Sequence, residues 1–99
     1  MRCFEVEVNG ERYCLAGVGD VGALSAFVTC VGVRGPDGAT VAGPTYLSVS
    51  GFSGSVEDQR PVHWREGIHP LAPDDVITVR VVEADRPDPG VPSVPPAQV

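Results

Sequence analysis

The sequence predicts an all-β protein: a small, mainly antiparallel sandwich or barrel of five to six strands, followed by a disordered Pro-rich C-terminal tail. Three observations predict this fold class. Asn9-Gly10 separates two alternating segments, which is the strongest short signal of a β-hairpin. Strand-favouring Val, Thr, Phe and Tyr fill the segments 24–33, 45–52 and 76–84. Turn residues separate neighbouring segments, so consecutive strands should pair antiparallel.

The N-terminal hairpin comprises residues 4–8 and 12–16. A two-residue turn places Val8 opposite Glu11 and sets the register of the remaining pairs. This register predicts an apolar face, a polar face and a cross-strand pair between Glu7 and Arg12. The other predicted pairs are Val6 with Tyr13, Glu5 with Cys14 and Phe4 with Leu15. The apolar face then holds Phe4, Val6, Val8, Tyr13 and Leu15, and the polar face holds Cys3, Glu5, Glu7, Arg12 and Cys14.

Residues 24–33 carry apolar side chains at both odd and even positions, which is typical of a central strand buried on both sides. A helix over 23–31 is the alternative, with Asp20 as its cap. That helix would give a hairpin–helix–strand order resembling a β-grasp α+β domain. The β-branched residues of this segment favour the strand.

The second half of the chain alternates turns and strands. Gly35 to Gly38, with Pro36 in its second place, predicts a turn. In the next segment Leu47 and Val49 alternate with serines, which predicts a half-exposed strand. Residues 62–64 form a short strand candidate, and 76–84 is the clearest strand of the chain. From Pro87 onward five prolines in 13 residues predict a flexible tail that joins no sheet, so the domain should cover 1–86 and the tail 87–99.

Charge and composition exclude several classes of function. The chain has thirteen acidic residues, seven Arg and no Lys, which gives a net charge of −6. Mechanisms that need a lysine, such as a P-loop or a Schiff base, are therefore impossible. The Arg residues are scattered, whereas nucleic acids and anionic membranes require a clustered basic surface. We expect neither as a partner.

Compartment and redox state follow from the same composition. No apolar segment resembles a signal peptide or a transmembrane helix, which predicts a cytoplasmic protein. Cys3, Cys14 and Cys30 show no C-x-x-C spacing, so we expect three reduced thiols. Arg in place of Lys, with abundant Val, Gly and Pro, is typical of a GC-rich bacterial genome.

The glycines of "GVGDVG", Gly17 to Gly22, match the dinucleotide-binding pattern G-x-G-x-x-G, and Asp37 follows 20 residues after Gly17. A functional motif opens a helix whose N-terminus holds the pyrophosphate, and a parallel strand must follow. Here the preceding strand is the second arm of a hairpin, and the following segment favours a strand. The sequence therefore predicts a loose turn that joins two strands, and no cofactor.

The sequence lacks the residue spacings that are typical of metal sites and of serine hydrolases. His63 and His69, the only histidines, could join the cysteines in a zinc site, but no close ligand pair is present. We expect no bound metal. The segment "GFSGS" departs from G-x-S-x-G, so no catalytic serine is indicated.

The stretch "VHWRE" contains the most suggestive binding residues. Trp64 is the only Trp, and Trp and Arg are enriched at binding hot spots. Phe52 lies in what the sequence predicts to be a flexible loop. The candidate partner-binding residues are Phe52, His63, Trp64 and Arg65. The competing interpretation is that Trp64 fills the core, since large aromatic residues are mostly buried.

Together these features favour a small, non-enzymatic, acidic binding domain that acts through protein–protein interaction. One concrete form is an inhibitor or immunity-type protein that blocks a basic partner. Two alternatives stay open. One is a small-molecule or metal-binding pocket around His63 and His69, with or without an enzymatic activity. The other is a structural subunit that forms a homo-oligomer through an exposed strand edge.

Overall fold

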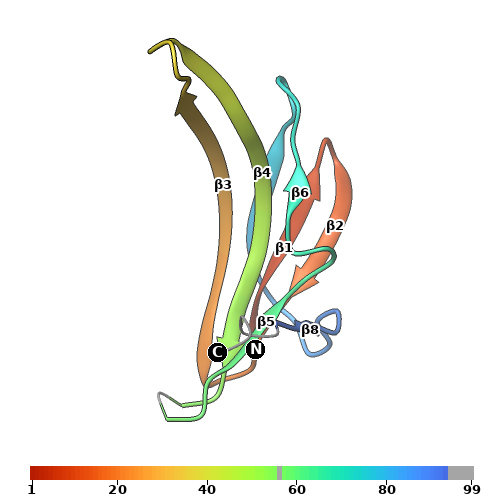
Figure 1. Ribbon diagram of the computed structural model, residues 1–99. Coiled ribbons are helices and arrows are strands. Elements are labelled where there is room, and N and C mark those ends of the chain that lie inside the picture. Colours follow the sequence, from red (N-terminus) through yellow and green to blue (C-terminus); the bar gives the residue numbers. More distant parts are fainter. Residues whose placement is uncertain (56, 94–99) are drawn as a thin grey trace.

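The computed structural model describes residues 1–55 and 57–93, and these residues form two antiparallel sheets with no helix (Figure 1). The three-stranded sheet has the order β2-β1-β7. The second sheet has the order β3-β4-β5-β8, and β6 also pairs with β4. The strands are β1 (Arg2–Val8), β2 (Glu11–Ala16), β3 (Gly22–Arg34), β4 (Thr40–Ser53), β5 (Arg60–His63), β6 (His69–Pro70), β7 (Ile77–Glu83) and β8 (Val91–Pro92). The predicted all-β class is confirmed, and the helix alternative over 23–31 is wrong.

The core lies between the two sheets. Its β1–β2 side supplies four side chains, its β4 side supplies Leu47 and Val49, and Trp64 follows β5. Leu47 and Val49 are fully buried while Ser48 and Ser50 are half-buried, which confirms the predicted alternation of this strand. The buried cluster comprises Val6, Tyr13, Cys14, Ala16, Leu47, Val49 and Trp64.

The N-terminal hairpin forms around the predicted turn, but its predicted register is wrong beyond the second pair. Asn9 (φ 53°) and Gly10 (φ 81°) adopt the left-handed conformation that a two-residue hairpin turn requires. Val8 faces Glu11, and Glu7 faces Arg12, as expected. A β-bulge then inserts Tyr13 as an unpaired residue, so the next pairs are Val6 with Cys14, Glu5 with Leu15 and Phe4 with Ala16.

The bulge has a direct consequence for the core. Cys14 was expected on the polar face, yet Tyr13 and Cys14 are both buried, with 6% and 1% of their surfaces exposed. A bulge lets two neighbouring side chains depart from strict alternation, because it bends the strand and turns one of them. Arg12 also forms its ion pair elsewhere: its guanidinium lies 3.6 Å from the Asp88 carboxylate.

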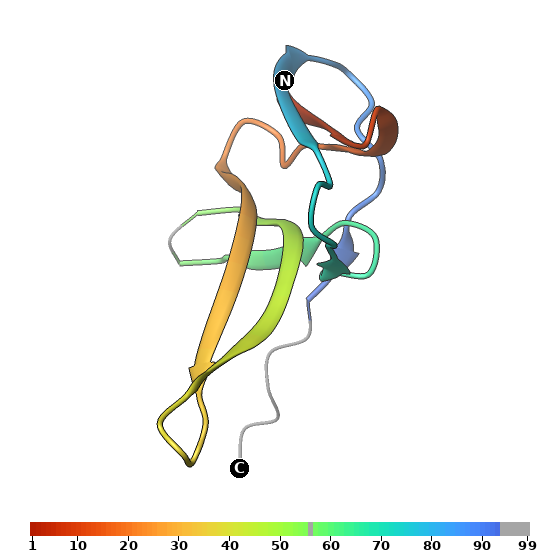
Figure 2. The ribbon, with the colours of Figure 1, turned by 90° about the horizontal axis from the view of Figure 1, so that it is seen from above.

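Strand β3 lies at the edge of its sheet, so the prediction of a central strand that is buried on both sides is wrong. Among residues 1–55 and 57–93 it pairs only with β4, and together they make a long hairpin whose far end extends away from the other strands (Figures 1 and 2). Leu24 and Ala26 pack against the core, whereas Phe27, Val28 and Val33 are exposed, so the strand is not buried on both sides. The expected turn over 35–38 is confirmed, with Gly38 N–H donating to the Gly35 carbonyl at 3.0 Å.

The segment after Pro87 joins the sheet, and the prediction that it would not is wrong for the described residues. Val91–Pro92 forms β8 beside β5, and the Ser93 amide donates to the Pro61 carbonyl at 2.9 Å. A proline at a sheet edge lacks only a donor that would otherwise face solvent, so it is tolerated there. Residues 94–99 of the predicted tail lie outside the described residues.

No helix of the described residues is long and apolar enough to cross a membrane.

Candidate functional site

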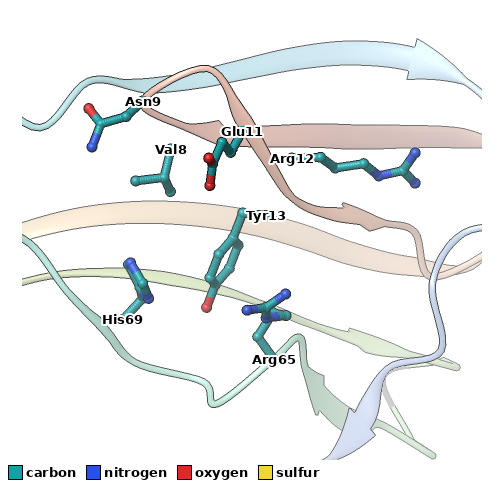
Figure 3. A pocket seen from close by; sticks show the side chains of 7 residues that line it. All are labelled: Val8, Asn9, Glu11, Arg12, Tyr13, Arg65 and His69. Atoms are coloured by element: carbon teal, nitrogen blue, oxygen red, sulfur yellow. The ribbon is translucent and has the colours of Figure 1, made fainter.

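A pocket of about 360 Å³ lies between the β1–β2 turn and the segment that leads from β5 to β6 (Figure 3). Tyr13 points across it toward Arg65 and His69. The Arg65 guanidinium carbon lies 5.1 Å from the centre of the Tyr13 ring, a cation–π distance. The His69 ring meets the same Tyr ring edge-on at 5.1 Å. The lining residues are Val8, Asn9, Glu11, Arg12, Tyr13, Arg65 and His69.

Backbone conformation positions Arg65 over this ring. Arg65 has φ of 60°, which is uncommon for a residue with a side chain, and Gly67 follows at φ of 81°. These two residues turn the chain sharply between β5 and β6. Glu66 extends toward both side chains, with its carboxylate 3.8 Å from Arg65 Nε and 2.8 Å from His69 Nδ1. The hydrogen bond from His69 is the main reason that the pKa of Glu66 is lowered.

Neither Tyr13, which lines the pocket, nor Cys14, which follows it in the core, is activated as a nucleophile. Burial raises the pKa of Tyr13 to about 12, and the nearby Glu66 carboxylate opposes ionisation further. Burial likewise raises the pKa of the Cys14 thiol to about 11, with Asp88 adding to the shift. Both groups stay protonated at neutral pH, whereas nucleophilic catalysis needs a lowered pKa or an adjacent base.

The Tyr13 hydroxyl is buried with no hydrogen-bond partner among the residues that the structure describes. Tyr13→Phe should therefore raise the free energy of unfolding at pH 7 by about 1 kcal/mol, because no bond is lost and the desolvation cost of the unpaired hydroxyl is removed.

The same variant should change stability at high pH. The folded pKa of Tyr13 is about 12 against a usual value of 10.0, so the folded state holds this proton longer than the unfolded state does. Its contribution is complete below pH 10 and is lost as the pH rises toward 12. Urea denaturation between pH 8 and 12 should show a fall above pH 10 that Tyr13→Phe reduces. An unchanged slope in the variant would contradict this assignment.

The four sequence-derived candidates do not form one surface. Trp64 is 2% exposed, so its indole belongs to the core and cannot contact a partner in this structure. Phe52 lies in β4 rather than in a loop, half-buried, with its backbone paired to Ala23 and Pro61. His63 is half-buried and shares a 2.8 Å hydrogen bond with the Ser93 hydroxyl. Arg65 alone of the four is exposed and lines the pocket.

The two histidines serve different contacts. His69 lines the pocket and contacts Glu66, whereas His63 contacts Ser93 and the edge of Gly67. The two histidines therefore do not line one common pocket. In the described residues, 1–55 and 57–93, no group of three His, Cys, Asp or Glu side chains is placed to hold a metal ion.

The "GVGDVG" glycines form the connection between the two sheets, as the turn interpretation predicted. They lead from β2 into β3, and no helix begins there to hold a pyrophosphate. Gly17 and Gly19 border a second pocket beside Trp64, but no Arg or His side chain lines it. Gly22 is required at its position: its φ is 143°, and a Cβ atom there would lie 2.1 Å from the Phe52 carbonyl oxygen.

Sequence reasoning missed Tyr13 and Asp88 as organising residues. Asp88 accepts the Leu15 amide at 2.8 Å through its carboxylate and the Trp64 indole N–H at 2.9 Å through its carbonyl. Both contacts join residues far apart in the chain, so local pattern could not reveal them. The residues around Tyr13 also do not predict the β-bulge that turns its side chain inward.

The remaining surface feature is the β3–β4 hairpin. Four large apolar side chains on it are about half exposed or more: Phe27, Val28, Val33 and Val41. From Gly22 to Val33, β3 contains no charged residue and no proline. The register of this hairpin shifts between Cys30 and Gly32, where β4 has two residues, Gly43 and Pro44, against Val31 of β3, so the extra residue lies on β4.

The chain matches no protein-family model, no curated protein and no solved structure.

Proposed function

We propose that this chain is a non-enzymatic protein-binding domain that accepts an extended segment of its partner beside β3. The observation that carries the proposal is the free edge of β3. One side of this 13-residue strand pairs with β4, and in the described residues its other side pairs with no strand. Such an edge presents a row of backbone donors and acceptors that an added strand can satisfy.

The other strand edges carry features that discourage such pairing. Strand β2 has Glu11, Arg12 and a bulge, and β7 has Arg80 and Glu83. The two-residue strands β6 and β8 are short and each ends in a proline. Charges, bulges, prolines and short length are the usual means of blocking edge-to-edge association. The contrast with β3 supports a role for that edge in binding.

Side chains on β3 would add apolar contacts to the backbone pairing. Phe27 is 53% exposed and Val28 is 59% exposed, and neighbouring residues of a strand point to opposite faces. An added strand would therefore meet an apolar side chain on each face of the sheet. In strand addition, backbone bonds supply affinity and such side-chain contacts supply specificity.

The acidic charge supports a basic partner as one form of this proposal, as in an inhibitor or immunity-type protein. Opposite charge accelerates encounter, and salt weakens that effect. A cytosolic location is part of the proposal, supported by the three free cysteines, since thiols stay reduced in that compartment.

Site-specific cross-linking tests the proposal. A photoreactive benzoylphenylalanine should be placed at Phe27, and separately at Val81, which is exposed on β7. Irradiation in native extract should trap a protein at position 27, because a segment paired with β3 lies within reach of that side chain. The trapped protein is identified by mass spectrometry. Absence of adducts at position 27, or equal yields at both positions, would reject the β3 edge as the binding surface.

A further inference from the structure

We infer that the segment bound beside β3 is β3 of a second copy of this chain, paired antiparallel about a two-fold axis near Phe27. The inference rests on the strand-addition function proposed above, and it takes the partner to be a second copy of the chain in place of a basic protein. Two-fold dimers are the commonest homo-oligomers, and their interface uses the same surface patch on both copies. Such a surface must be complementary to itself. Whether β3 meets this requirement can be judged from its charged and apolar residues.

The charges that flank β3 are complementary under antiparallel pairing. Asp20 lies just before the strand, Arg34 is its last residue, and both are exposed. Neither forms an ion pair with another residue of the described part of the chain. An axis at Phe27 lies seven residues from each, so it brings Arg34, at the end of the strand, near the bend that carries Asp20 of the second copy, twice in the dimer. Parallel pairing in register would instead set like charges side by side.

Apolar side chains lie at the centre of the same arrangement. Phe27 meets its own counterpart at the axis, and Val28 lies beside it. These side chains are 53% and 59% exposed in the isolated chain. Burial of apolar surface at the centre, with charges at the rim, is the usual anatomy of a protein interface.

The distribution of net charge also permits two acidic copies to associate. The whole hairpin from Gly22 to Ser53 contains one Arg and one Asp, which cancel. The net charge of −6 therefore lies entirely outside it. Antiparallel pairing directs the two hairpins in opposite directions, so each acidic body lies toward the other copy's neutral hairpin. Repulsion between the bodies is further reduced by screening over roughly 8 Å at physiological salt.

Charge reversal with rescue tests the register as well as the association. The wild-type chain should be dimeric by light scattering and sedimentation at micromolar concentration. Arg34→Asp and Asp20→Arg should each raise the dimer Kd about 10-fold, since two attractive contacts become repulsive. The double variant Asp20→Arg/Arg34→Asp should return the Kd to within about 3-fold of wild type, because both pairs are restored with exchanged signs.

Arg86→Glu is the matched control, because it reverses an exposed Arg that lies outside the hairpin and, like Arg34, forms no ion pair in the described residues. It should leave the dimer Kd unchanged, and circular dichroism should show all variants folded. A monomeric wild type would overturn the dimer, while an adduct with a different protein at position 27 would preserve the proposed function. No adduct at all would reject both. Antiparallel β3 pairing would be overturned if the single reversals left the dimer Kd unchanged. It would also be overturned if the Kd stayed raised in the double variant.

Discussion

Trp64→Ala should lower the free energy of unfolding by about 3–5 kcal/mol, which is typical of truncating a buried aromatic residue. Trp64 is the largest fully buried side chain, with 2% of its surface exposed, and it lies in the cluster that joins both sheets. The substitution would open a cavity that β-strands on either side cannot readily fill. Domains of this size are stable by only about 5–15 kcal/mol, so the variant should be close to unfolding at 37 °C.

Trp64→Phe separates packing from hydrogen bonding. It retains an aromatic ring but removes the N–H that donates to the Asp88 carbonyl at 2.9 Å. We expect a loss of about 1–2 kcal/mol, because the hydrogen bond to the half-buried carbonyl is lost and the smaller ring fills less of the core. Urea denaturation monitored by circular dichroism measures both variants. If Trp64→Ala were as stable as wild type, Trp64 would not be a core residue, and the hot-spot interpretation of "VHWRE" would regain its basis.

Truncation after Arg86 should destabilise the domain by about 3–5 kcal/mol, because each hydrogen bond that is lost contributes about 0.5–1.5 kcal/mol and buried partners are left unsatisfied. The deleted segment supplies Asp88, whose backbone N–H donates to the Leu15 carbonyl at 2.8 Å. It also supplies β8, and Gly90 lies against the Trp64 ring. The expected result is a markedly lower urea midpoint with a far-UV spectrum that is still β-rich at low temperature.

Asp88→Ala is the graded control for this truncation. It removes the carboxylate that accepts the Leu15 amide and pairs with Arg12, yet keeps the carbonyl that binds Trp64. The loss should be about 1–2 kcal/mol, between wild type and the truncated chain. Equal stability of the truncated and full-length chains would mean that residues 87–93 do not pack on the domain in solution, as the composition of that segment first suggested.

The β1–β2 hairpin shows how far local pattern reaches. Asn9-Gly10 specified the turn, because these two residues tolerate positive φ at low cost, and Val8 and Glu11 pair as the turn requires. The register then changed at Tyr13. A bulge is favoured when the free energy gained by burying an extra side chain exceeds the loss of a hydrogen bond between the strands. That gain depends on the opposite sheet.

The candidate site shows the same limit. The pocket joins Tyr13 to Arg65 and His69, more than fifty residues later in the sequence. Arg65 could be selected from sequence as a residue of an unusual segment, but its position over the Tyr13 ring depends on a turn with positive φ. Trp64, chosen by the same reasoning, is buried because β5 leads its side chain into the space between the sheets.

By itself, the sequence determined the all-β class, the hairpin turns at Asn9-Gly10 and over 35–38, and the inward alternation of Leu47 and Val49. These features depend on backbone preferences and on periodicity within one segment, so neighbouring residues suffice to specify them. Tertiary structure alone decided that β3 is an edge strand and that the Pro-rich segment through Ser93 packs on the domain. Both depend on long-range pairing, in which an apolar strand is equally compatible with burial between two neighbours and with an open edge.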